Sequence, residues 1–291
     1  MTETHCSKRE TTLRPLVGAA LFIVAIVAMP LVDGLTKFLA EALPVMFLAW
    51  TRFLVAAMIT LPPALLVDPR PWVQRRALVD QGLRTVCLVA AIALYSLAIA
   101  RVPLADALGA YLISPVVATL LSAWWLRERL RRHQLAALLF GLTGALLIVR
   151  PGLQWEPGLL LALASGVLFG CYLAATRRVT SDTHPLVILA FQYVVGGLLL
   201  TPLAIPDWPA VGEAALWLIF LMGALSAAGH LLLILAFRFA PASLLAPLVY
   251  LEVVSTTLIG FIAFDDLPAP LTWLGILAVV TGGLLVLRQR A

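Results

Sequence analysis

The chain has 291 residues, of which 62% are hydrophobic and 12% charged, and its mean hydropathy is +1.03. This is more apolar sequence than a water-soluble domain needs, and it predicts an all-α integral membrane protein. The net charge of +5 does not indicate a nucleic-acid-binding protein, because the basic residues stand in short clusters between apolar segments and form no amphipathic face.

Ten apolar segments follow one another along the chain, most of them long enough to cross a bilayer as a helix. Their expected ranges are 15–37, 44–66, 82–101, 103–125, 133–150, 156–177, 184–205, 213–237, 241–264 and 270–288. Short connections join them, and proline opens several. Residues 1–14 are predicted to form a cytoplasmic tail, and we expect no extramembrane catalytic or sensory domain.

The distribution of lysine and arginine predicts that both termini lie in the cytoplasm. With the N-terminus inside, basic residues gather on the cytoplasmic side at Lys8, Arg9, Arg14, Arg70, Arg75, Arg76, Arg84, Arg127, Arg129, Arg131, Arg132, Arg177, Arg178, Arg238, Arg288 and Arg290. The outer side holds Lys37, Arg101 and Arg150, while Arg52 falls within a span. We therefore expect a multi-pass protein of a bacterial-type inner membrane with an even number of spans.

The second half of the sequence repeats the first. Residues 98–150 align without a gap on residues 236–288, so that a proline, a Thr-Leu pair and a Thr-Gly pair coincide. This alignment predicts two five-helix repeats, 15–150 and 156–288. Because five is an odd number, the second repeat must enter the membrane from the opposite side. Inverted repeats are typical of secondary transporters, whose binding site lies near the membrane midplane.

A carboxylate lies near the middle of the ninth segment. Glu252 stands about halfway along residues 241–264, and a bare charge at this depth costs roughly 3 kcal/mol or more. Pro247 precedes it by about one turn and favours an interrupted helix, because proline cannot donate a backbone hydrogen bond. Glu252 is therefore a candidate for binding substrate or a proton. The alternative is a protonated acid that only packs against a neighbouring helix.

Other charged residues in the spans admit two interpretations each. Arg52 either receives a carboxylate from a substrate or pairs with an acid such as Asp33. Asp33 and Lys37 are one turn apart and form either a structural ion pair or part of an outer gate. His230 is either a packing residue or a member of a proton relay with Glu252.

Neutral residues complete the set of candidates. Ser114 occupies the position that corresponds to Glu252 in the first repeat, and Pro115 beside it predicts a second interrupted helix. Aromatic residues within the spans line a cavity or serve as packing and anchoring groups: Tyr111, Tyr193, Tyr250 and Trp50. Neither a metal-ligand set nor a nucleotide-binding motif is present, so we expect no cofactor and no use of ATP.

Four stretches are similar to the EamA type of the drug/metabolite transporter superfamily, and the similarity covers essentially the whole chain. They are LRERLRRHQLAALLFGLTGALLIVRPG (126–152), APLTWLGILAVVTGGLLVLRQR (269–290), AFRFAPASLLAPLVYLEVV (236–254) and VDGLTKFLAEALP (32–44), the last followed by Arg52. The resemblance implies ten spans, a central substrate cavity and transport without ATP. The chain has Asp265-Asp266 where many relatives carry a Gly-Glu pair, which we interpret as loop variation.

Together these features predict a secondary transporter of small organic metabolites that works by alternating access. Glu252 would bind a substrate ammonium or a proton, and Arg52 would bind a substrate carboxylate. This complementarity favours an amino-acid-like zwitterion as the substrate, and export is the preferred direction. Uptake of an S-adenosylmethionine-like or riboflavin-like metabolite is the alternative, and an intramembrane lipid-modifying enzyme is the alternative outside this class. The expected partners are the substrate and the bilayer. The sequence leaves open whether protons take part and whether the chain forms a homo-oligomer, and we expect no nucleic acid as a partner.

Overall fold

The computed structural model describes residues 3–67, 75–102, 104–149, 157–180, 183–206 and 208–264, with 273–275, 277–278 and 280–282 near the C-terminus. The loop with Asp265 and Asp266 lies outside the described residues, as do parts of the tenth predicted span and the basic residues Arg70, Arg150, Arg288 and Arg290. All regular secondary structure in the described part of the chain is helical.

The helices follow the predicted segments closely. They are α1 (Glu3–Leu39), α2 (Val45–Val67), α3 (Arg75–Ile99), α4 (Leu104–Tyr111), α5 (Ser114–Trp125), α6 (Arg132–Val149), α7 (Pro157–Val179), α8 (Pro185–Ala204), α9 (Glu213–Phe239), α10 (Ala242–Leu245), the 3-10 helix η2 (Ala246–Leu251) and α11 (Glu252–Phe264). Helix α1 begins at Glu3 rather than at residue 15, so the predicted tail continues the first helix. The many Glu, Lys and Arg residues there are good helix formers.

Eight spans are long and apolar enough to cross a membrane in the described part of the chain, with α4–α5 and α10–α11 each forming one span. Two shorter apolar helices, Gln134–Gly144 and Trp273–Gly282, stand where the fifth and tenth spans are predicted. A β-carbon on Gly282 would lie 3.2 Å from Cβ of Phe140, so these two helices touch. The all-α membrane fold is thus confirmed, and the number of ten spans stays a prediction.

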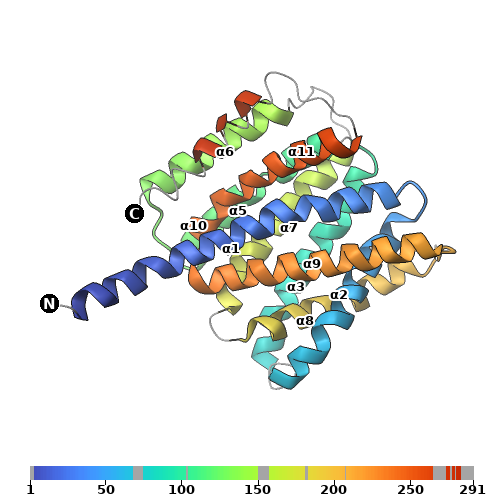
Figure 1. Cartoon of the computed structure of the whole chain (residues 1–291), viewed down its shortest axis with the longest axis horizontal. Coiled ribbons are helices and arrows are strands. Elements are labelled where there is room, and N and C mark those ends of the chain that lie inside the picture. Colours follow the sequence, from blue (N-terminus) through green and yellow to red (C-terminus); the bar gives the residue numbers. More distant parts are fainter. Residues whose placement is uncertain are drawn as a thin grey trace.

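Helices from the two halves pack in matched pairs. Helix α1 runs beside α9, α3 packs along α7, and α2 packs along α8 (Figure 1). Helices α1, α2 and α3 are the first three spans, and α7, α8 and α9 are the sixth, seventh and eighth. If each of these spans is exchanged with its counterpart in the other half, the pair α1–α9 becomes the pair α3–α7, and the pair α2–α8 becomes itself. This packing fits the two-repeat architecture.

The fourth and ninth spans are both interrupted, as the two prolines predict. Helix α4 ends at Tyr111 and α5 begins at Ser114, while η2 separates α10 from α11, which begins at Glu252. Ser114 and Glu252 therefore both open the second part of a broken span. Small residues allow the close approach to the first break: a β-carbon on Gly166 of α7 would overlap the carbonyl oxygen of Tyr111. Gly170, four residues later on the same helix, also approaches the chain closely, since its β-carbon would lie 2.7 Å from the carbonyl oxygen of Ser114.

The structure corrects the place of Arg84. Its position in the sequence predicts a place with the basic residues of the cytoplasmic side, yet its side chain is fully buried in α3, within the span Leu78–Ile99. Two other helices supply its hydrogen-bond acceptors, Thr176 of α7 and Gln192 of α8. A count of basic residues near span ends does not detect such partners, because they are distant in sequence.

Candidate functional site

A cavity of about 50 Å³ lies between the two halves, enough for a few water molecules. Seven helices line it with Ile26, Met29, Asp33, Arg52, Ala91, Ile92, Tyr95, Ser96, Tyr111, Ser165, Phe169, His230, Leu233 and Glu252. Five of the sequence-predicted residues thus meet at one place: Asp33, Arg52, Tyr111, His230 and Glu252.

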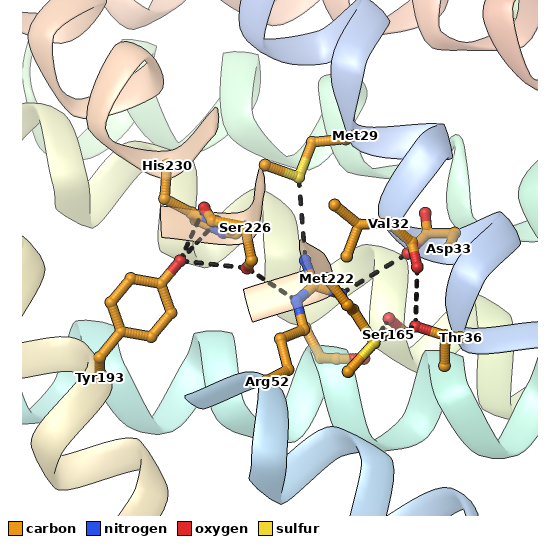
Figure 2. A network of polar contacts seen from close by, with 11 residues as sticks. Met29, Val32, Asp33, Thr36, Arg52, Ser165, Tyr193, Met222, Ser226 and His230 are labelled. Carbon is orange, nitrogen blue, oxygen red and sulfur yellow. Dashed lines mark hydrogen bonds and ion pairs between the residues drawn. The ribbon is translucent and has the colours of Figure 1, made fainter. Parts of the chain in front are cut away.

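Arg52 is held from several sides (Figure 2). Its Nη1 lies 3.6 Å from Oδ1 of Asp33, and the two side chains are only 7% and 16% exposed. Its Nε donates a 2.8 Å hydrogen bond to Oγ of Ser226, and Nη2 points toward Sδ of Met29 at 3.8 Å. Of the two interpretations of Arg52, pairing with Asp33 holds in this conformation. A substrate carboxylate that binds Arg52 must therefore compete with Asp33.

Glu252 is buried and faces the cavity from the first turn of α11. Its Oε2 atom has no hydrogen-bond partner among the described residues. A buried carboxyl oxygen without a partner is costly unless the group is protonated or receives a ligand. Glu252 is thus free to accept a proton or a donor group in the cavity.

His230 connects the cavity to a buried polar network. Its Nδ1 lies 3.1 Å from the Tyr193 hydroxyl and 3.1 Å from the carbonyl oxygen of Ser226. The Tyr193 hydroxyl donates to the same carbonyl oxygen at 2.8 Å. The side-chain Oγ of Ser226 also accepts a hydrogen bond from Arg52. The network therefore links His230 to the ion pair of Arg52 and Asp33 (Figure 2).

Aromatic rings form one wall of the cavity. Tyr111 contacts Tyr95 at a ring distance of 5.0 Å and Phe169 at 5.3 Å, and Phe169 stacks on Tyr172 at 5.5 Å. Tyr95 and Phe169 were not among the predicted residues, nor were Ser96 and Ser165. Neutral and aromatic side chains cost little in a bilayer, so the sequence carries no signal that would separate them from packing residues.

The remaining sequence-predicted residues lie outside the cavity lining. Ser114 is fully buried, and its hydroxyl has no partner among the described residues. Tyr250 packs its ring against Gly141 and is not part of the cavity lining. Trp50 donates to Oγ1 of Thr201 at 3.1 Å and contacts Trp208. Lys37 lies in the last turn of α1.

Contacts between the two halves lie at the end of the bundle that we predict to be cytoplasmic. Both carboxylate oxygens of Glu128 accept backbone hydrogen bonds at the start of α10, from Ala242 at 3.3 Å and Ser243 at 2.9 Å. Arg177 of α7 pairs with Glu128 at 3.5 Å and also donates to the carbonyl oxygen of Phe237. Glu128 of the first half thus contacts two segments of the second half, α7 and the start of α10.

Comparisons with known proteins agree with this architecture. The profile of the EamA-like transporter family matches the chain twice, over residues 16–150 and 156–288. The riboflavin transporter of Vibrio cholerae is 26% identical over 91% of both chains, and the pseudopaline exporter of Pseudomonas aeruginosa is 29% identical over 66% of both. A crystal structure of a protein 21% identical in sequence superposes with a TM-score of 0.76, covering 97% of this chain and 99% of the other.

Proposed function

The chain belongs to the EamA-like transporter family, and from this premise we propose that it exports an amino-acid-like zwitterion by secondary transport. That it is a membrane transporter of metabolites follows from the family and from relatives that are themselves transporters. The proposal covers the zwitterionic substrate, the direction of transport and the roles of single residues. Transport is preferred over a lipid-modifying activity because the relatives transport metabolites.

One observation carries the choice of substrate: opposite charges line the same small cavity. Glu252 offers an unpartnered carboxyl oxygen, which suits an ammonium group. Arg52 offers a guanidinium, whose planar fork suits a carboxylate. The substrate carboxylate would replace Asp33 as the partner of Arg52.

The dimensions of the cavity support alternating access. A volume of about 50 Å³ admits water but no organic metabolite, so binding must enlarge the site. The contacts of Glu128 with Arg177 and α10 must break when the predicted cytoplasmic end opens. Helix interruptions beside Ser114 and Glu252 supply backbone that can adjust during this movement. Export is preferred in line with the exporter among the relatives.

A riboflavin-like substrate is the second candidate, because an aromatic wall lines the cavity. The rings of Tyr95, Tyr111 and Phe169 offer apolar faces on which a flat ring system could stack. The relative from Vibrio cholerae is named a riboflavin transporter.

The test is a substrate panel in proteoliposomes that contain the purified protein. Labelled amino acids of different side chains and labelled riboflavin are supplied on one side, and both uptake and efflux are measured. We expect saturable movement of one or more zwitterionic amino acids that Arg52→Gln abolishes. Movement of riboflavin alone would favour the second candidate, and movement of neither class would refute both.

A further inference from the structure

A second buried arginine lies away from the central cavity. Nη1 of Arg84 donates to Oε1 of Gln192 at 2.8 Å and to Oγ1 of Thr176 at 3.4 Å, and Nη2 donates to the carbonyl oxygen of Ile188 at 3.0 Å. Its guanidinium carbon lies 5.3 Å from the ring centre of Tyr172. Every one of these partners is neutral, whereas the guanidinium stays charged in proteins.

No carboxylate forms an ion pair with Arg84 in the part of the chain that the structure describes. Arg52 differs in this respect, because Asp33 neutralises it. A fully buried cation in a membrane span is costly and is expected to face a counter-charge. Among the described residues, Arg84 therefore lacks the counter-charge that a buried cation in a membrane span is expected to have.

Buried polar atoms without a partner in the described part of the chain lie on Arg84 itself, on its partner Gln192 and on Gln81. Nε of Arg84 has no acceptor, and Nε2 of Gln192 has no acceptor although Oε1 of the same amide is bonded to Arg84. Gln81 precedes Arg84 by one helical turn on the same face of α3, and both of its amide atoms are buried without a partner among the described residues. We call Gln81, Arg84 and Gln192 the Arg84 cluster. Most of its unsatisfied atoms are donors, and donors around a cation suit an anion.

The Arg84 cluster lies near the predicted cytoplasmic end of the bundle. Arg84 is only about 9 Å along the helix from Leu78, where the span begins. Asp80 and Arg178 pair at 4.0 Å at this end of α3 and α7. Toward the centre of the membrane, Tyr172 contacts both Gln192, at 3.4 Å, and the ring of His230, at 6.2 Å.

We propose that the Arg84 cluster is a second anion-binding site, which takes a carboxylate or a chloride ion from the predicted cytoplasmic end when α3, α7 and α8 part there. The anion neutralises Arg84 and accepts hydrogen bonds from its Nε and from the amides of Gln81 and Gln192. The inference does not depend on the substrate proposed for the central cavity, because no residue of the Arg84 cluster lines that cavity.

The test measures the unfolding midpoint of the purified full-length protein in detergent while chloride, or in a second series acetate, replaces methanesulfonate, which has no carboxylate, at constant ionic strength. A ligand that binds only the folded protein raises the midpoint in a saturable way. We expect such a rise for the wild type and its loss in Arg84→Gln. Response to acetate alone identifies a carboxylate site, and response to chloride identifies a halide site. A wild-type midpoint that depends on neither anion overturns the proposal.

Gln81→Leu gives an independent measurement if Arg84→Gln does not fold. Replacement of an unsatisfied buried amide by an apolar side chain of similar size should preserve the fold. If the cluster binds an anion, the half-saturating concentration rises by about tenfold. The matched control is Gln134→Leu, a buried glutamine of α6 that accepts a hydrogen bond from Arg131 and should keep the wild-type response. An unchanged curve in Gln81→Leu, or a response that survives in Arg84→Gln, means that Arg84 only clamps three helices together.

Discussion

The ion pair of Asp33 and Arg52 gives the most direct energetic prediction. Asp33→Asn removes a charge that lies 3.6 Å from Arg52 and keeps the size of the side chain. Two unit charges at this distance attract by about 5 kcal/mol at an effective dielectric constant of about 20, and desolvation of both side chains cancels part of that attraction. We expect Asp33→Asn to lower the free energy of unfolding by about 3 kcal/mol, because Arg52 is left buried with neutral partners.

A double-mutant cycle in detergent checks this magnitude with Asp33→Asn, Arg52→Gln and the combined variant. If the charges attract each other, the combined variant is more stable than the two single losses predict, by about 2 kcal/mol. Additive losses would refute the ion pair as a stabilising contact. The same variant bears on transport: Asp33→Asn releases Arg52, so a zwitterionic substrate should bind with a lower KM.

Two further predictions concern packing and topology. Gly166→Ala should lower the free energy of unfolding by about 1–3 kcal/mol, because the new β-carbon overlaps the carbonyl oxygen of Tyr111; the matched control Gly197→Ala, whose β-carbon would meet nothing closer than 3.9 Å, should change it little. Reporters fused to either terminus should indicate that the terminus lies in the cytoplasm, since basic residues gather on that side. An alkaline phosphatase fusion that is active at either end would contradict this orientation.

Much of the fold could be predicted from apolar segments and prolines alone. Span limits follow from the length of each apolar run, and Pro115 and Pro247 predict the breaks in the fourth and ninth spans because proline removes a backbone donor. Glu252 and Arg52 stand out because a charge in an apolar segment is costly. The hypothesis of a zwitterionic substrate places both side chains in one site, whereas the contacts of Arg52 with Ser226 and Met29 depend on helix packing and could not be predicted.

Other parts of the site were missed for the same physical reason. Tyr95, Ser165 and Phe169 are unremarkable in an apolar sequence and acquire a role only through the cavity that they line. Arg84 was assigned to the cytoplasmic surface because it lies near the start of its span. Its burial results from Gln192 and Thr176, which are about a hundred residues away in the chain.

In the proposed mechanism Glu252 carries the proton or the cationic end of the substrate, and the variant Glu252→Gln tests this role. The variant keeps the size and hydrogen bonding of the side chain and removes its ability to change charge. Transport by the purified variant is measured in proteoliposomes over a range of pH, beside the wild type and Glu41→Gln, which alters an exposed acid. We expect Glu252→Gln to fold but to lack substrate-driven and pH-dependent transport, and Glu41→Gln to transport normally. Transport by Glu252→Gln at the wild-type rate and with the wild-type pH dependence would contradict this role of Glu252.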